Sequence, residues 1–430
     1  MMRAFSLISV LLLAAFSCFS QEHFTIYGVI LDEDSGEPLP YATIKIKDKP
    51  IGTVANGLGE FGFHIPEKYV NDTLIISMLG YESFQGLIHL LPSKIKIRLI
   101  QKPIVLKEVT VLEKNLDAEQ ILKKALANIH VNYPIKPHMM EAFFRQAQTT
   151  DAQYVAILEA AVKIHDPGYT ARKKEEVAIA GIRKSHYLNT KKYLSLTDTA
   201  YIKKNNTLVI SLRHNAIRQV ASGSFRNIYH GKHSYELDTT LYYDGRPTFI
   251  ISATPKVNRG YLKKGQDENR VNKILIDAKT YAIVKVIFEY SPRGDYAPSH
   301  FRNVTHTNDS IASIVAGHTH VYEFSNYNGR YYLKYVRWSD WVRDYNLRSR
   351  KVVHINEYRH ELLINKISTD PNQFSEMHDV MAPASSLYRQ GKHYQEVFWE
   401  KYNVIYESAQ EKQLINNLLQ GISNQKEQYR

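Results

Sequence analysis

Short stretches of alternating apolar and polar residues follow one another from Phe24 to Val111. FTIYGVIL and YATIKIK alternate in this way, and the second stretch places Ala42, Ile44 and Ile46 on one face. DTLIISMLGYESF and KIKIRLI continue the pattern at short intervals. Turn residues separate the stretches, first in DEDSGEPLP and then at the Asn56-Gly57 pair. Several short strands at this spacing predict a β-sandwich.

The longer remainder of the chain begins with a helical pattern and continues as strands. Asp117 is placed to cap a helix whose apolar stripe comprises Ile121, Leu122, Ala125, Leu126 and Ile129. A second helix is predicted at 153–164. PTFIISAT then predicts a strand, and two hairpins are predicted with turns at Asp277–Thr280 and Asn328-Gly329.

A long strand, RKVVHINEYRHELLINKI, and a helical tail complete the chain. HYQEVFWEKYNVI is rich in aromatic residues, and QEKQLINNLLQGI places Ile415, Leu418 and Leu419 on one face. These patterns predict a mainly β protein. A large, curved antiparallel sheet with helices against one side follows the sandwich.

The first 20 residues have the features of a signal peptide. Arg3 supplies the positive charge, and Leu7 to Phe16 is an apolar stretch too short to span a bilayer. Cleavage after Ser20 is favoured, although Cys18 follows the small Ser17 and leaves lipidation of this cysteine open. Cleavage after Ser20 leaves a mature chain without cysteine, and so without disulfides. Export without disulfides favours a Gram-negative envelope: the periplasm, or the periplasmic or outer face of the outer membrane.

Charge is unevenly distributed along the chain, whose net charge is +12. Residues 21–110 hold nine Lys and Arg against eleven Asp and Glu, whereas residues 111–430 hold 45 against 32. A basic exported domain suits anionic lipids or acidic glycans, and it is compatible with peripheral contact with a membrane. Local clusters of cations supply five candidates for contact with an anionic ligand: Arg172, Lys173, Lys174, Lys263 and Lys264. No nucleic-acid-binding motif is present, so no nucleic acid is expected as a partner.

One run of residues closely resembles the carboxypeptidase-like regulatory domain, a prealbumin-like sandwich of the carbohydrate-binding-like superfamily. The run includes Gly36-Glu37-Pro38-Leu39-Pro40-Tyr41-Ala42, Gly59-Glu60-Phe61, Ile65-Pro66 and Leu79-Gly80-Tyr81. The resemblance spans residues 24–112 and implies a seven-stranded-type sandwich that performs no chemistry. The same module precedes the plug of TonB-dependent outer-membrane transporters, which implies a role as a docking module.

Two weaker resemblances concern residues 117–430. The hairpin ILIDAKTYAIV resembles the open half-barrel of periplasmic lipoprotein carriers. Ala142-Phe143-Phe144-Arg145 and Phe398-Trp399-Glu400 with Tyr402-Asn403 are similar to an uncharacterised family of envelope proteins. That family has no established activity, so the resemblance implies none for this chain.

Histidines provide the only candidates for metal chemistry. His138 and Glu141, like His393 and Glu396, have the spacing of a zinc carboxypeptidase motif, but the rest of that signature is absent. His318 and His320 flank Thr319 in a predicted strand and share one face. They are weak candidates for metal ligands, and neither a metal nor another cofactor is predicted.

Tyrosine is abundant: 26 of the 30 tyrosines follow Val111. Such residues build sheet cores, or they form a surface on which sugars stack. No glycine-rich phosphate loop or nucleophile elbow is present, so the chain is not expected to be an enzyme. The favoured function is binding of a lipid, a glycan or an envelope protein by the large β domain. The alternatives are an assembly partner of a TonB-dependent transporter and, least favoured, a metal-dependent hydrolase.

Overall fold

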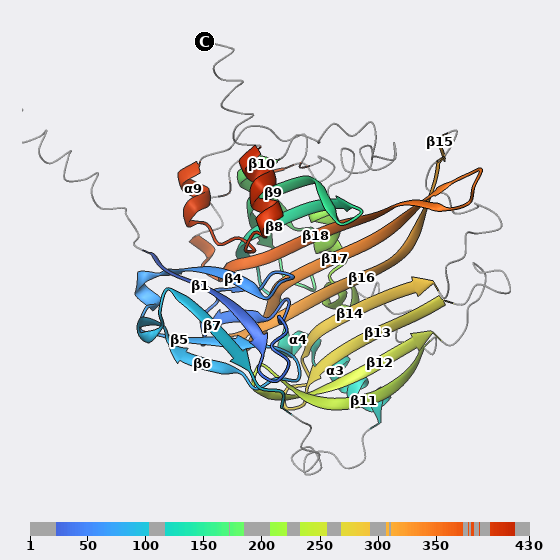
Figure 1. Ribbon diagram of the computed structural model, residues 1–430. Coiled ribbons are helices and arrows are strands. Elements are labelled where there is room, and N and C mark those ends of the chain that lie inside the picture. The colour runs from blue at the N-terminus through green and yellow to red at the C-terminus, as the bar shows by residue number, and fades with distance from the viewer. Residues whose placement is uncertain are drawn as a thin grey trace, which may run out of the picture.

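The computed structural model describes residues 23–102, 117–171, 173–184, 207–221, 233–255, 268–292, 307–308, 311–372, 377, 380–381, 387 and 396–417. Strands dominate these residues, which confirms the predicted mainly β class (Figure 1). The signal peptide and Cys18 lie outside the described residues. Within those residues, no helix is long and apolar enough to cross a membrane.

The N-terminal part is a sandwich of seven strands, as predicted. A three-stranded sheet has the order β4-β1-β7, and a four-stranded sheet has the order β3-β2-β5-β6. Ala42, Ile44 and Ile46 are fully buried in the core between them, together with Phe61 and Phe63. The strands are β1 (His23–Asp32), β2 (Thr43–Ile46), β3 (Gly52–Val54), β4 (Glu60–Pro66), β5 (Thr73–Ser77), β6 (Phe84–Leu87) and β7 (Lys94–Leu99).

The larger part is built on one eleven-stranded sheet. Ten strands follow the order β10-β9-β8-β18-β17-β16-β14-β13-β12-β11, and β15 pairs with β16. The sheet is open, because no pairing between β10 and β11 closes the order of the described strands. Its strands are β8 (His138–Thr150), β9 (Gln153–Asp166), β10 (Glu176–Lys184), β11 (His233–Tyr243), β12 (Arg246–Pro255), β13 (Glu268–Asp277), β14 (Ile283–Pro292), β15 (Thr307–Asn308), β16 (Ile311–Tyr327), β17 (Arg330–Asn346) and β18 (Val352–Ser368).

Both predicted hairpin turns are present. Asp277 accepts hydrogen bonds from the backbone amides of Lys279 and Thr280, which stabilises the turn between β13 and β14. Asn328 and Gly329 both have positive φ, 49° and 79°, at the tip between β16 and β17. These angles suit asparagine and glycine, so the sequence determines the position of this turn.

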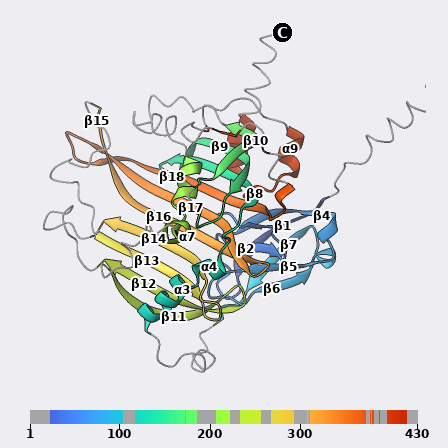
Figure 2. The same cartoon turned by 180° about the vertical axis from the view of Figure 1, so that it is seen from behind.

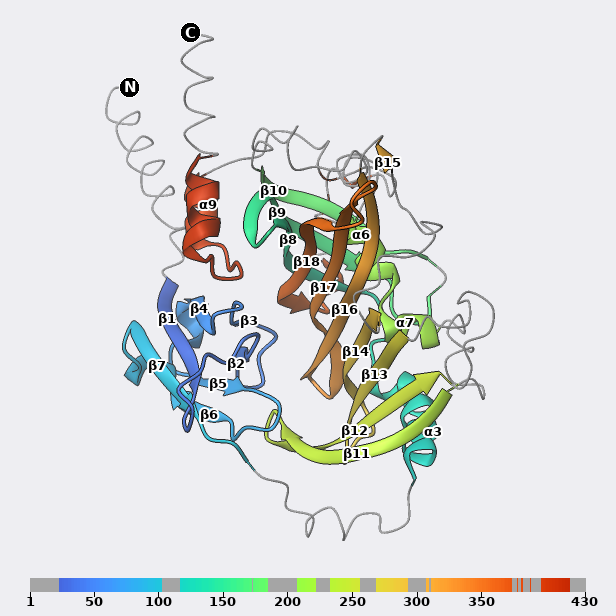
Figure 3. The same cartoon turned by 45° about the vertical axis from the view of Figure 1, so that its right-hand side comes forward.

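The concave face of the large sheet is covered by helices (Figure 3). They are α3 (Ala118–Ala127), α4 (Ile129–Asn132), α6 (Thr207–Arg213) and α7 (Ala216–Ala221). Asp117 and Gln120 form a capping box at the start of α3, as the sequence suggested for Asp117. Ile121, Leu122 and Ala125 pack into the same core as the concave side chains of β8, β12 and β13.

The opposite, convex face is covered as well, whereas the sequence predicted helices against one side of the sheet. Its side chains include the apolar Phe143, Tyr335 and Leu363, and these pack against Val54 of the sandwich and Trp399 of α9 (Glu396–Lys401). A sheet that is apolar on both faces requires cover on both.

The predicted helix at 153–164 is wrong, because this stretch is strand β9. Its central residues, from Val155 to Val162, are buried on both faces and, apart from Glu159, are all apolar, so the stretch shows no strand alternation. Periodicity alone does not separate such a run from a buried helix.

Candidate functional site

The candidate site is a cleft of about 730 Å³ between the sandwich and residues 396–417, here called the C-terminal segment. The floor of this interdomain cleft is the outer face of the sheet β4-β1-β7, with Tyr27 and Gly62. The roof is the C-terminal segment, with Trp399, Tyr406 and Lys412. The two ends of the described chain therefore meet across one opening (Figure 1).

Two tyrosine rings meet edge-on in this cleft because a glycine makes room for them. Tyr27 pairs with Gly62 across β1 and β4, and its ring lies edge-on to that of Tyr406, with centroids 6.0 Å apart. A Cβ at position 62 would lie 3.0 Å from the Tyr406 ring and 3.2 Å from the Tyr27 ring. Tyr27 keeps 39% of its surface exposed, so part of this aromatic surface faces solvent.

One side chain of the C-terminal segment forms two hydrogen bonds to the backbone at the edge of the sandwich. The amide group of Asn403 accepts a hydrogen bond from the backbone N–H of His64 at 2.8 Å and donates one to the carbonyl of His64 at 2.9 Å. His64 lies on β4, an edge strand whose outer groups would otherwise be unpaired. Asn403 thus replaces a neighbouring strand at this position and fixes the roof over the floor.

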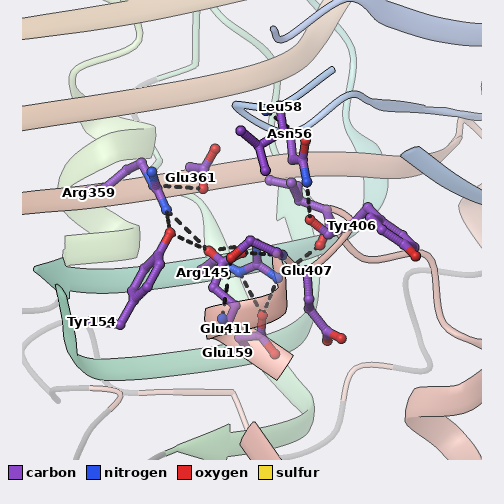
Figure 4. Close-up of polar contacts among 12 residues, drawn as sticks. Asn56, Leu58, Arg145, Tyr154, Glu159, Arg359, Glu361, Tyr406, Glu407 and Glu411 are labelled. Atoms are coloured by element: carbon purple, nitrogen blue, oxygen red, sulfur yellow. Dashed lines mark hydrogen bonds and ion pairs between the residues drawn. The ribbon is translucent and has the colours of Figure 1, made fainter. Parts of the chain in front are cut away.

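Beneath the roof lies a network of buried charges (Figure 4). Arg145 on β8 and Glu159 on β9 form its centre, and their side chains are 1% and 0% exposed. Arg145 Nε donates to Glu159 Oε1 at 2.6 Å, and Nη2 donates to the carbonyl oxygen of Ile405 at 2.8 Å. The guanidinium of Arg145 therefore links the large sheet to the C-terminal segment.

Two further arginines extend this network to the carboxylates of the C-terminal segment. Arg183 joins Glu159 to Glu407, and its guanidinium lies 4.6 Å from the centre of the Trp399 ring. Arg359 donates to Glu411 at 3.2 Å. Breaking a buried ion pair is costly because it leaves a charge uncompensated, so these contacts hold the segment firmly.

The two carboxylates of the segment have opposite pKa shifts. Burial and the nearby Glu159 raise the pKa of Glu407, against the opposing effect of Arg183. Burial also raises the pKa of Glu411, but Arg145, the Ser408 amide and Arg359 outweigh it and lower this pKa to about 2. Glu411 is therefore the firmly ionised anchor of the segment.

The cations predicted from the sequence do not gather at this cleft. Lys173 and Lys174 are exposed in the connection between β9 and β10, and neither lines the cleft. Arg172, Lys263 and Lys264 lie outside the described residues. Contact of these five residues with an anionic ligand stays a prediction.

His318 and His320 share one face of β16, as predicted, and their rings stack with centroids 4.7 Å apart. His320 also stacks on Trp338 and lies 3.0 Å from a carboxylate oxygen of Asp340. Within the described part of the chain, no group of three or more His, Cys, Asp or Glu is arranged to hold a metal ion. The nearby His360 is buried, and burial lowers its pKa to about 4.

The charged network was missed at the sequence level, although its signal is visible there. Arg145 and Glu159 each interrupt an apolar stretch, AFFRQA and VAILEAAV. A charge inside such a stretch requires a buried partner.

The two sequence motifs that are similar to an envelope-protein family, around Phe143 and around Trp399, are in contact with each other. Tyr402 donates to the carbonyl of Ala142 at 3.0 Å, and Phe143 contacts Trp399.

Comparison with known proteins identifies the sandwich. Residues 26–111 match the CarboxypepD_reg-like domain family. This match confirms the resemblance that the glycine, proline and tyrosine positions suggested. No curated protein matches the chain significantly.

Three solved structures show low similarity to the chain. A LolA superfamily protein from Nitrosomonas europaea has 12% identity and a TM-score of 0.20, and the match covers 60% of this chain and 97% of that one. Lipovitellin has 11% identity and a TM-score of 0.24, covering 59% and 27%. A DUF1329 family protein from Desulfovibrio piger has 10% identity and a TM-score of 0.18, covering 58% and 94%.

Proposed function

We propose that this protein is an exported, non-catalytic binding protein of a Gram-negative envelope whose ligand is a glycan held in the interdomain cleft. The observation that carries the proposal is the pair of tyrosine rings, Tyr27 and Tyr406, at an opening that also has charged side chains. Binding sites commonly combine aromatic surface with a few fixed polar groups. The CarboxypepD_reg-like domain supports a non-catalytic role, because the regulatory domain that it resembles performs no chemistry.

The polar lining of the cleft favours a glycan over an acyl chain. Glu60, His64 and Lys412 line the opening with the aromatic residues. Burying such groups against a lipid tail would remove them from water, and the tail would replace none of the hydrogen bonds that they make to water. Sugar hydroxyls both donate and accept hydrogen bonds, so a glycan would satisfy these groups while its apolar face lies on a ring.

The preorganised walls of the cleft support the same function. Asn403 fixes the roof to β4, and the Arg145 network holds the roof to the large sheet. A site that is rigid before binding loses little conformational entropy when the ligand arrives. Trp399 also borders the cleft, and among the described residues its buried Nε1 has no hydrogen-bond partner. Buried donors normally have one, so this indole is a candidate donor to a ligand or to water.

Native mass spectrometry of the mature protein, gently purified from an envelope fraction, tests the proposal first. A retained mass that matches an oligosaccharide is expected. A retained lipid would overturn the glycan assignment, and a bare polypeptide that also fails to bind an oligosaccharide panel would overturn the function.

Two tyrosine variants then test the location of the site. We expect Tyr27→Ala and Tyr406→Ala each to weaken glycan binding about two- to twelvefold in calorimetry, since a ring contact contributes about 0.5–1.5 kcal/mol. Tyr69→Ala, which removes a tyrosine elsewhere on the sandwich, is the matched control. Unchanged affinity in both cleft variants would place the site elsewhere.

A further inference from the structure

Three neighbouring strands extend beyond the rest of the large sheet. β16, β17 and β18 each contain 17 residues, whereas β14 contains 10 and β8 contains 13. β8 ends at Thr150, opposite Asn356, so Val352–Ile355 of β18 continue past it. Figures 1 and 2 show the resulting hairpin protruding at the end of the molecule far from β1.

Apolar and basic side chains are combined at this hairpin tip, defined here as residues 346–355. Val352, Val353 and Ile355 are 43%, 41% and 49% exposed. Val315 on the adjacent β16 is 40% exposed. The turn itself carries three exposed cations: Arg348, Arg350 and Lys351. The tip contains no acidic residue, so its positive charge is not compensated from within.

The turn presents these side chains from a fixed backbone. The side chain of Asn346 accepts hydrogen bonds from the amides of Arg348 and Ser349 at 3.0 and 2.9 Å. Its backbone accepts from Arg350 and donates to Lys351. Asp151, in the turn between β8 and β9, accepts from the amide of Ile355 at 2.9 Å and contacts His354 at 2.8 Å. The tip is therefore ordered without a partner.

We infer that the hairpin tip docks on the surface of a bilayer that contains anionic phospholipids. Exposed apolar side chains can enter the boundary between headgroups and acyl chains, while flanking cations stay at the phosphates. The placement suits this partner, because the tip protrudes at the end of the molecule far from β1 (Figures 1 and 2). Charge complementarity favours anionic lipid, since the chain as a whole carries a net charge of +12.

Cations at an exposed strand also have a different established effect, which is to prevent pairing with a strand of another molecule. The two roles predict different effects when the cations are removed. If the cations only protect the strand, their removal causes self-association and leaves membrane binding unchanged. If they dock the protein, their removal lowers binding to anionic vesicles while the protein stays monomeric.

Sedimentation of the full mature chain with vesicles tests the inference. We expect binding to vesicles of phosphatidylcholine that contain about 30% phosphatidylglycerol, and little binding to vesicles of pure phosphatidylcholine. High salt should weaken the binding because it screens exposed charges. Equal binding to both vesicle types would overturn the inference.

Charge and apolar variants separate the two contributions. Each cation near an anionic surface strengthens binding roughly fivefold, so R348Q/R350Q/K351Q should bind about 100-fold more weakly. The control K47Q/K96Q/R98Q removes three exposed cations from the sandwich and should change binding little. An equal loss in this control would show that net charge alone is responsible and would overturn the tip as the docking site.

Tryptophan fluorescence tests whether the tip enters the bilayer, independently of how tightly the protein binds the vesicles. Val353→Trp places an indole at the tip, and its emission should shift to the blue when anionic vesicles are added. Absence of a shift in bound protein would overturn the insertion of the tip. Glycan binding in the cleft is expected to be unaffected by all of these variants, so failure of this inference and failure of the proposed function are distinguishable.

Discussion

Replacement of Glu411 by Gln should release the C-terminal segment from the large sheet. Glu411 accepts hydrogen bonds from Tyr154 at 2.8 Å and from the Ser408 amide at 2.7 Å, and it neutralises Arg145 and Arg359. Gln has nearly the same shape but no charge. The substitution therefore leaves two buried guanidiniums with too little negative charge around them.

The magnitude follows from the pKa of this carboxyl. The pKa falls from its usual value of 4.5 to about 2 in the folded protein. At about 1.4 kcal/mol for each pKa unit, ionised Glu411 contributes about 3 kcal/mol at neutral pH. Because the pKa is lowered on folding, this contribution is present above pH 4.5 and is lost as the pH falls towards 2.

Hydrogen exchange measured by mass spectrometry reports on local opening of the segment. At pH 7, peptides from residues 396–417 should exchange roughly 100-fold faster in Glu411→Gln than in the wild type, as about 3 kcal/mol requires. The difference should shrink as the pH falls from 5 to 2. Glu67→Gln, an exposed carboxylate on the sandwich, is the control. Equal protection of the segment at pH 7, or a difference that persists at pH 2, would refute the reasoning.

Three other changes test the remaining contacts. Asn403→Ala removes both hydrogen bonds to the His64 backbone, so the segment should open more easily by about 1–3 kcal/mol in hydrogen exchange. Gly62→Val places side-chain atoms where the Tyr406 ring lies, so it should abolish glycan binding in calorimetry while the melting temperature of the sandwich changes little. Lys334→Met removes a buried amine whose pKa burial lowers to about 7. Its charge is unfavourable below pH 7, so the variant should be more thermally stable than the wild type at pH 6, and this gain should vanish near pH 10.5.

The sequence predicted local features of the fold more reliably than contacts across the chain. The sandwich and both hairpin turns could be predicted because their signals lie within a few residues, as at Asn328-Gly329. The helix predicted at 153–164 failed because β9 is covered on both faces. That cover is contributed by distant elements, Trp399 and Ile405 on one side and Leu122 on the other.

The interdomain cleft could not be predicted because it exists only where the two ends of the described chain meet. Tyr27 and Tyr406 are far apart in sequence, and neither belongs to a recognisable motif. Their approach depends on Gly62 in the floor and on Asn403 in the roof. The periodicity of a single sequence reports local structure, and it does not indicate which residues far apart in the chain come into contact.

The walls of the cleft are held together by an apolar cluster on the convex face of the large sheet and by the buried charges beside it. The side chains of Val54, Tyr335 and Trp399 join the sandwich, the sheet and the C-terminal segment in this cluster. Apolar contact is non-directional and would tolerate small displacements of the segment. Arg145 removes that freedom, because its guanidinium must satisfy Glu159 and the Ile405 carbonyl at once. The apolar cluster thus supplies adhesion while the ion pairs set the position of the roof, which is why Glu411→Gln should disturb the cleft even though Glu411 lies outside its lining.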